Sequence, residues 1–242
     1  MVTEAPAVHS LLRITTPAAL SWDDSSSDGR PPDWTASALQ RLPFVVVRRN
    51  PPRAGSIAVG VRGIFRSQRA PAWLPSTAVQ ACVTPRMLAR QCGWCRADYS
   101  KSPAVAVLNQ VEMILTAQGF AGSWGPGGSV GAELASGVKC ASPTSDLDLV
   151  LYADSVLEKR AAQALHAELS ALPVRVDVLL EVPQGGVALA DFVSDADRLL
   201  MRTAQGPRLV RDPWNVHAQA SLHAPASLHA PAPLAEMSAC PA

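Results

Sequence analysis

The sequence predicts an α/β (α+β) fold, in which helices cover a mixed β-sheet and a small β-containing domain precedes it. Residues 85–216 alternate apolar, strand-like runs with amphipathic helical segments, and this order is typical of a helix-covered sheet. Before them, residues 44–47 and 57–61 are short β-branched runs separated by a turn-forming segment. With 242 residues, the chain is long enough to bury a full core.

Three regions of the chain differ in composition. We assign residues 1–84 to a small N-terminal domain with a mobile polar segment at about 23–33, and residues 85–216 to the larger domain. The boundary follows from Thr84 and Pro85, because threonine caps helices and proline favours the first helical turn. Residues 217–242 repeat Ser-Leu-His-Ala-Pro-Ala in tandem without an apolar face, so we expect a disordered low-complexity tail.

Hydrophobic spacing and turn residues predict the elements of the larger domain. Apolar residues recur at helical spacing over 102–119, where Ser102 and Pro103 form a start signal and Gly119 a stop signal. The elements expected after this helix are, in order, a glycine-rich turn over 122–131, a strand over 146–152, an amphipathic helix over 155–171, a strand over 174–182 and a hairpin from 199–202 and 208–211.

The bulk composition argues against several classes of partner. The hydrophobic fraction of 48%, the charged fraction of 17% and the net charge of +1 do not suit a protein that relies on a basic surface, so we expect no nucleic acid. No apolar run approaches the roughly 18 residues of a membrane span, and the first residues lack a basic, apolar leader. We therefore expect a cytoplasmic protein without a membrane partner.

Five cysteines, an odd number without regular spacing, indicate a reducing compartment instead of a disulfide framework. Cys92 and Cys95 have the CxxC spacing of a redox or zinc motif, but no second CxxC pair or nearby histidine supplies the other zinc ligands. Structural thiols are the favoured interpretation, and a redox role is the alternative.

Three aspartates form the main candidate site. Side chains at alternate positions of a strand point to one face, so Asp146 and Asp148 are expected to project together, with Leu147 and Leu149 in the core. Asp177 lies on a strand that we expect to neighbour the first. Adjacent carboxylates repel unless a cation joins them, and Mg²⁺ prefers carboxylate, phosphate and water oxygens. The sequence therefore predicts a magnesium site with catalytic Asp146, Asp148 and Asp177; the alternative is that Asp146 lies at an exposed strand entry.

A glycine-rich turn precedes these aspartates. At Gly128 and Ser129, small residues allow backbone amides to approach an anion, and a helix beginning near Ser129 directs its positive end to the same place. We predict that Gly128 and Ser129 bind substrate phosphate. A flexible turn is the alternative that this motif alone leaves open.

The Gly-Ser turn, the Asp-x-Asp strand and the later aspartate resemble the nucleotidyltransferase superfamily, although the gap between Ser129 and Asp146 is longer than in its minimal pattern. Longer stretches of the sequence are similar to the phosphoribosyl-dephospho-CoA transferase family of malonate decarboxylase, also called its holo-acyl-carrier-protein synthase. The similar segments are 58–74, Trp-Gly-Pro-Gly-Gly-Ser-Val-Gly at 124–131, Ser-Asp-Leu-Asp-Leu at 145–149, 184–190 and 202–210.

This resemblance implies transfer of a 2′-(5-phosphoribosyl)-3′-dephospho-CoA group from its triphosphate precursor, 2′-(5-triphosphoribosyl)-3′-dephospho-CoA, to a serine of the malonate decarboxylase acyl carrier protein subunit, with release of diphosphate. It implies that Asp146 and Asp148 are the catalytic pair. Guanidinium groups match phosphate oxygens, so we expect phosphate contacts from arginines. The candidates are Arg202 and Arg208, with Arg62 and Arg66 as further ones.

Three alternatives stay open at this point. The chain can transfer another nucleotide to a different protein or to a small-molecule hydroxyl. It can be a non-catalytic module that binds a nucleotide or a carrier protein, although a binding-only site does not need to concentrate carboxylates. Trp124, beside the turn, can stack on adenine or pack inside the protein.

Overall fold

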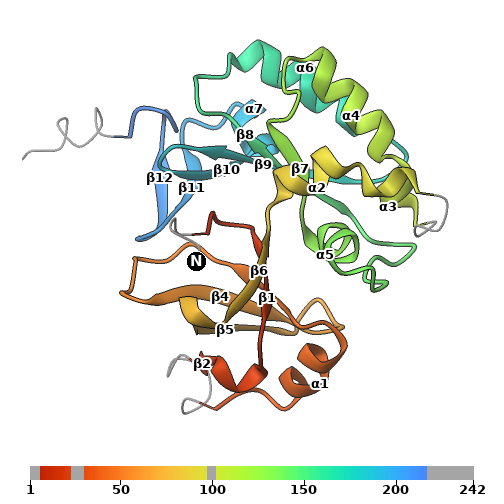
Figure 1. Ribbon diagram of the computed structural model, residues 1–242. Helices are drawn as coiled ribbons and strands as arrows, with labels where there is room; N and C mark the ends of the chain where they lie inside the picture. The colour runs from red at the N-terminus through yellow and green to blue at the C-terminus, as the bar shows by residue number, and fades with distance from the viewer. Residues whose placement is uncertain (1–5, 23–29, 97–101, 217–242) are drawn as a thin grey trace, which may run out of the picture.

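Two six-stranded sheets, stacked one above the other, make up the computed structural model of the chain (Figure 1). The structure describes residues 6–22, 30–96 and 102–216. Most of the predicted mobile segment and the predicted tail, residues 217–242, lie outside the described residues. None of the described helices is long and apolar enough to cross a membrane.

The N-terminal sheet is antiparallel throughout, in the order β2-β5-β4-β3-β1-β6. Its core contains Leu12, Val45, Val59 and Leu74, against which Leu39 of the helix α1 packs. The elements of this part are β1 (Leu11–Ile14), η1 (Pro17–Ala19), β2 (Ser21–Trp22), α1 (Trp34–Arg41), β3 (Phe44–Val47), β4 (Ser56–Arg62), β5 (Arg69–Pro75), η3 (Ser76–Ala78) and β6 (Val79–Val83).

The two predicted runs are confirmed as β3 and β4, but the sequence did not reveal the neighbouring strand β5. This strand contains Pro71 and Pro75, and proline cannot donate a ladder hydrogen bond, so the run does not look like a strand. In the structure β5 is nevertheless paired with β4 along seven positions, from Ser56↔Pro75 to Arg62↔Arg69. Tertiary pairing outweighs the local signal here.

The chain leaves the first sheet at Thr84, which caps α2 (Pro85–Gln91) as predicted. The Thr84 hydroxyl accepts a hydrogen bond from the Met87 amide at 3.1 Å. A side chain at Gly125 would overlap the Pro85 backbone, so the start of α2 packs directly on the second sheet. The short turn η4 (Gly93–Cys95) follows it.

The helix predicted over 102–119 is two helices, α3 (Pro103–Ala106) and α4 (Leu108–Ala117), with a break at Val107. Its ends agree with the prediction: the Ser102 hydroxyl accepts from the Val105 amide at 3.3 Å, and Gly119 has a positive φ of 82°. Its apolar side chains pack into the core of the second sheet, as expected.

The C-terminal sheet has the order β12-β11-β10-β9-β8-β7, in which β8 and β9 are parallel and the other pairs antiparallel. The mixed, helix-covered sheet confirms the predicted fold class. Its remaining elements are β7 (Trp124–Pro126), α5 (Gly128–Ser136), β8 (Leu147–Tyr152), α6 (Lys159–Ser170), β9 (Val176–Val182), β10 (Gly185–Ala188), α7 (Leu189–Val193), β11 (Leu199–Thr203) and β12 (Gly206–Val210).

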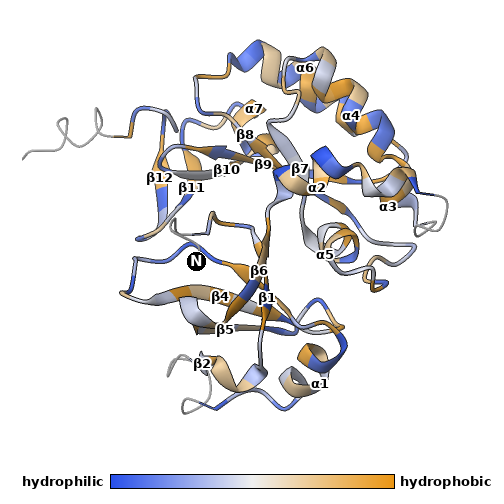
Figure 2. Cartoon of the chain, viewed as in Figure 1, coloured by the Kyte–Doolittle hydropathy of each residue, from blue (hydrophilic) through white to orange (hydrophobic). Residues whose placement is uncertain are grey.

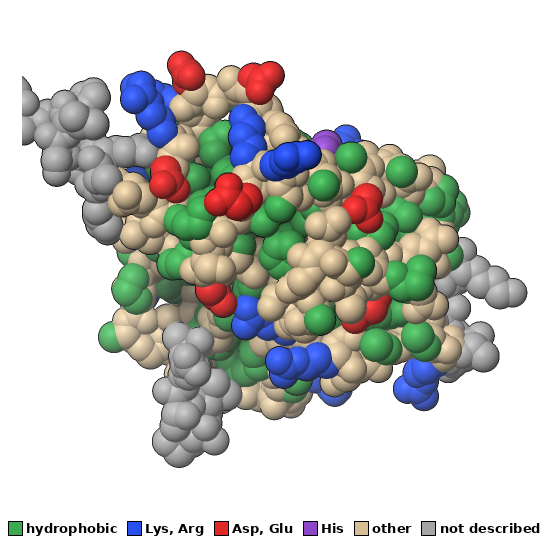
Figure 3. Space-filling model, turned by 90° about the horizontal axis from the view of Figure 1, so that it is seen from above, with side chains coloured by type: hydrophobic (Ala, Val, Ile, Leu, Met, Phe, Trp, Pro, Cys, Tyr) green, Lys and Arg blue, Asp and Glu red, His purple; other side chains and the backbone are tan. Residues whose placement is uncertain are grey.

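The main core lies between this sheet and the helices α4 and α6, which cover its upper side in Figure 1. Both helices carry apolar and polar residues on different sides (Figure 2). The outer surface over them mixes acidic and basic side chains with exposed apolar ones (Figure 3). Because Leu147, Leu149 and Leu151 of β8 point into this core, the intervening side chains point to the other face, toward the N-terminal sheet.

A candidate active site between the two sheets

A cleft of about 1160 Å³ lies between the two sheets, and residues from both line it. The C-terminal sheet contributes Asp148 and Asp177, and the N-terminal sheet contributes arginines from β4, β5 and the loop that joins them. The cleft therefore has an acidic wall and a basic wall, each built by a different sheet.

The strand register brings the predicted aspartates together. Asp148 of β8 is directly opposite Asp177 of the parallel neighbour β9. Asp146 stands just before β8, where the adjacent Leu147 amide donates to the Arg175 carbonyl at 2.9 Å. Alternation along the strand directs Asp146 and Asp148 to the same face. Asp148 and Asp177 thus line one wall of the cleft; Asp146 does not line it, but it lies close enough to Asp148 to raise the pKa of that group.

The charges around Asp148 shift its pKa upward from the ordinary aspartate value. The first cause is desolvation within the cleft; Asp177 and Asp146 add to the rise, whereas Arg62 and Arg69 oppose it. The carboxylate still reaches solvent through the mouth of the cleft, so its desolvation is partial and the neighbouring carboxylates add to the shift.

The basic wall consists of Arg62, Arg66 and Arg69. Arg62 and Arg69 are paired across the β4–β5 hairpin, and strand pairing places their side chains on one face. Desolvation lowers the pKa of Arg62, and the neighbouring Arg69 lowers it further. Arg66, in the hairpin loop, approaches Asp146 with 3.5 Å between Nη1 and Oδ2. This wall thus concentrates positive charge opposite the carboxylates.

The glycine-rich turn closes one end of the cleft. The Gly127 amide donates to the Asp148 carbonyl at 2.8 Å, which joins the turn to β8. Gly128 has a φ of 56°, and a Cβ there would overlap the Asp148 carboxylate, so only glycine fits. Gly128 lines the cleft at the start of α5, whereas Ser129 does not line it.

A buried glutamate holds the long segment between this turn and the aspartates. Glu133 is 2% exposed, and its Oε2 accepts hydrogen bonds from the Cys140 and Ala141 amides, both at 2.8 Å. Residues 137–146 therefore form an anchored loop that returns the chain to β8 next to the turn. The segment is longer than in the minimal superfamily pattern, but its length does not separate the glycine-rich turn from the aspartates.

The carboxylates suit a magnesium ion that also binds substrate phosphate. Within the described part of the chain, no three Asp, Glu, His or Cys side chains form a ready-made metal site. Asp146 instead contacts Arg66, and Asp177 accepts from Arg175 Nε at 3.0 Å. Both arginines are largely exposed, so these contacts are weak and easily replaced. Magnesium commonly takes one or two carboxylates and completes its coordination with phosphate and water, which this oxygen-only wall allows.

The structure separates the other predicted residues. Arg202 lines the cleft, but Arg208 does not. Arg208 is opposite Met201 in the β11–β12 ladder, so it lies on the other face of the sheet from Arg202. Trp124 is 0% exposed and packs against Trp94 with 6.0 Å between ring centroids, which favours the packing interpretation over stacking on adenine.

The sequence did not identify a polar cluster that joins the two sheets. His9 Nε2 lies 3.2 Å from Glu181 Oε2 of β9, and Arg49 donates to the same oxygen. His9 has a φ of 72°, a conformation that few side chains other than glycine adopt. These residues are 40 or more positions apart, so no local pattern signals them. Arg69 was not among the predicted phosphate contacts either, because only the register of the β4–β5 hairpin shows that it is paired with Arg62.

None of the cysteines in the described residues lines this cleft. Cys92 donates to the Ala89 carbonyl, with Sγ 3.2 Å from the oxygen, and Cys95 lies 3.4 Å from Asn109 Oδ1. In the described part of the chain Cys82, Cys92, Cys95 and Cys140 are free thiols.

Comparison with known proteins gives a consistent result. Residues 7–85 match the model of the phosphoribosyl-dephospho-CoA transferase MdcG N-terminal domain, and residues 92–213 match the C-terminal domain model of the same name. A phosphoribosyl-dephospho-CoA transferase of Azotobacter vinelandii is 42% identical over 212 residues, covering 86% of this chain and 98% of the relative. One from Pseudomonas fluorescens is 40% identical over 216 residues, covering 88% and 96%. The comparison with solved structures gave no significant match.

Proposed function

The chain belongs to the phosphoribosyl-dephospho-CoA transferase family, and from this we propose its complete reaction and the residues that carry it. The enzyme transfers the 2′-(5-phosphoribosyl)-3′-dephospho-CoA group from its triphosphate precursor to a serine of an acceptor protein, releasing diphosphate. The proposed acceptor is the acyl carrier protein subunit of malonate decarboxylase, and the proposed compartment is the cytoplasm, which suits the free thiols.

The observation that supports this assignment is the pairing of an acidic and a basic wall across one cleft. A triphosphate carries several negative charges and needs arginines or backbone amides around it. Arg62, Arg66 and Arg69 lie where they can bind its oxygens, and Arg202 lies in the same cleft. Gly128 brings the start of α5 to the phosphates, where backbone amides favour an anion.

The transfer is a substitution at phosphorus. The acceptor serine oxygen forms a bond to the α-phosphorus, the bond from that phosphorus to the diphosphate breaks, and the serine proton passes to a carboxylate of the acidic wall. Asp177 is the proposed proton acceptor, because it lies beside Asp148 on the wall and remains partly exposed, at 40% of its side chain. Magnesium bound by Asp146 and Asp148 would neutralise charge on the leaving diphosphate.

A protein acceptor is favoured over a small hydroxyl compound by the surface beside the cleft. Ile64 and Phe65, in the loop of the β4–β5 hairpin, are 72% and 67% exposed. The next residue, Arg66, reaches Asp146 at 3.5 Å, so the loop that carries these apolar side chains approaches the cleft, although neither side chain lines it. Exposed apolar groups beside a reaction site fit contact with another protein better than contact with a small polar substrate.

The direct test is incubation of the protein with Mg²⁺, 2′-(5-triphosphoribosyl)-3′-dephospho-CoA and the apo carrier subunit. Intact-mass spectrometry should show one added prosthetic group, with one diphosphate released. Replacing the acceptor serine by alanine, or omitting Mg²⁺, should stop the addition. Equal labelling from ATP would favour general nucleotide transfer, and no labelling from either donor would favour a binding module.

A further inference from the structure

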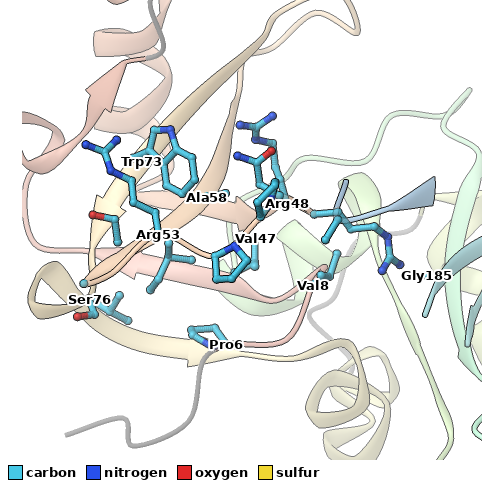
Figure 4. A pocket seen from close by; sticks show the side chains of 18 of the residues that line it. Pro6, Val8, Val47, Arg48, Arg53, Ala58, Trp73, Ser76 and Gly185 are labelled. Atoms are coloured by element: carbon cyan, nitrogen blue, oxygen red, sulfur yellow. The ribbon is translucent and has the colours of Figure 1, made fainter. Parts of the chain in front are cut away.

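A second cavity, of about 500 Å³, opens beside the loop that joins β3 to β4 (Figure 4). Residues of both sheets line it, from Val47, Ala58 and Trp73 of the first to Gly185 of the second. Its size suits a compact organic group. Neither the carboxylates nor the arginines of the reaction cleft take part in it.

The second cavity lies along the same seam between the sheets as the reaction cleft. Ala58 and Arg62 are four residues apart on β4, so their side chains share one face at a separation of about 13 Å. Ala58 lines the second cavity and Arg62 lines the cleft. The same spacing of about 13 Å separates Asp177 from Glu181 on β9.

The polar cluster of His9, Glu181 and Arg49 stands between the two spaces. His9 lines the cleft, Arg49 lines the second cavity, and both contact one oxygen of Glu181. The two spaces are therefore neighbouring compartments of one seam, and a single elongated ligand can reach both.

The lining of the second cavity is basic and apolar. Arg48, Arg49 and Arg53 line it, together with proline and aliphatic side chains, and among the residues that the structure describes no Asp or Glu side chain does. Arg53 is exposed, and its guanidinium carbon lies 5.4 Å from the centre of the Trp73 ring (Figure 4). Such a lining suits a ligand that combines a phosphate group with an apolar or aromatic body.

We propose that this cavity binds the diphosphate and pantetheine end of the donor while the reaction cleft holds its triphosphate. This inference rests on the proposed function, which supplies the donor. In 2′-(5-triphosphoribosyl)-3′-dephospho-CoA two linked ribose units separate the reacting phosphorus from the second diphosphate, so the two phosphate groups of the donor can occupy two different spaces along one seam. Arg53 then contacts the diphosphate, and the pantetheine arm lies along the apolar residues.

The test measures binding to the full-length protein by calorimetry with two fragments of the donor, dephospho-CoA and inorganic triphosphate. Arg53→Glu should weaken dephospho-CoA binding at least about tenfold and leave triphosphate binding within twofold. Arg62→Ala should show the opposite pattern. Arg198→Glu is the matched control, because this arginine is exposed and lines neither space; it should change neither affinity by more than twofold.

A second variant, Trp73→Phe, keeps an aromatic ring and should weaken dephospho-CoA binding less than Arg53→Glu does. Melting curves establish that each variant is folded. Unchanged dephospho-CoA binding in folded Arg53→Glu, or no dephospho-CoA binding by the wild type, overturns the proposal. Prosthetic-group transfer by the wild type is assayed in parallel. If transfer is normal while one of these two binding results is found, the subsite alone is rejected. If the wild type transfers nothing, the proposed function itself is rejected.

Discussion

At the scale of single residues, the acidic wall concentrates negative charge that the neighbouring arginines offset in part and that a bound cation would offset further. Asp148→Ala and Asp146→Ala should each lower the transfer rate by at least about 10³-fold, the scale on which a lost metal or charge contact acts. The measurement is the rate of mass addition to the carrier subunit. Asp197→Ala is the control, since this carboxylate is exposed and lies outside the cleft. A rate within tenfold of wild type would contradict the metal-site assignment.

The raised pKa of Asp148 makes a separate prediction about stability. Its folded-state pKa lies above the ordinary 3.8, so folding favours the protonated form, and this contribution to stability is lost as the pH rises through the folded pKa. Asp148→Asn should therefore raise the melting temperature at pH 7, measured in EDTA, and the gain should shrink toward pH 4. Because the Asp148 carboxylate reaches solvent, we expect the melting temperature to rise by less than about 4 °C. A gain that grows toward low pH would contradict this sign.

At the scale of elements, the β4–β5 hairpin carries both the basic wall and the exposed pair Ile64 and Phe65. A tight turn holds its loop, in which the Gly63 amide donates to the Gln68 carbonyl at 2.9 Å and the Phe65 amide to Gln68 Oε1 at 3.1 Å. The hairpin thus holds the exposed apolar pair in the same loop as Arg66, which contacts Asp146.

Replacing both Ile64 and Phe65 by serine should raise KM for the carrier protein by about tenfold or more, because the apolar contact area is lost. Donor affinity should stay the same. Steady-state kinetics at varied acceptor and varied donor separate the two effects. Met113→Ser is the control, since Met113 is 67% exposed on α4, away from the cleft. An unchanged acceptor KM would show that the acceptor docks elsewhere.

At the scale of the whole molecule, the cluster of His9, Arg49 and Glu181 connects the two sheets. Glu181→Gln leaves partly buried Arg49 without a counter-charge and should lower the free energy of unfolding by about 1–3 kcal/mol. Urea denaturation measures the change. The control is Glu158→Gln, at an exposed position where no side-chain cap is made. Equal stability of both variants would show that the sheets are held by apolar packing alone.

The chain beyond Val216 should be dispensable. The family match ends at residue 213, and the tandem repeat has no apolar face to bury. A protein ending at Val216 should transfer the prosthetic group at the wild-type rate and remain equally soluble. Loss of activity on truncation would indicate that this segment docks on the enzyme or on the carrier protein.

Local patterns in the sequence were enough for the two strands that carry Asp148 and Asp177, but not for β7, β10 and α7, which also line the cleft. Strand alternation indicated that Asp146 and Asp148 share a face, and the cap at Thr84 and the stop at Gly119 mark real helix ends. These features depend on residues a few positions apart, so they can be read along the chain. The break at Val107 and the proline-bearing β5 were missed, because packing and strand pairing outweigh local preference there.

The sequence by itself determined the Asp-x-Asp pair, the glycine turn and the segments that resemble the family, since each is made of residues close together in the chain. Only the tertiary structure decided which arginines line the cleft: Arg62, Arg66 and Arg69 face the carboxylates from the N-terminal sheet, Arg202 lines the cleft from the C-terminal sheet, and Arg208 lies on the other face of that sheet. It alone brought His9 and Arg49 to Glu181 and formed a second cavity along the seam. These contacts join residues distant in the chain, and their geometry is set by how the two sheets pack, which no local spacing encodes.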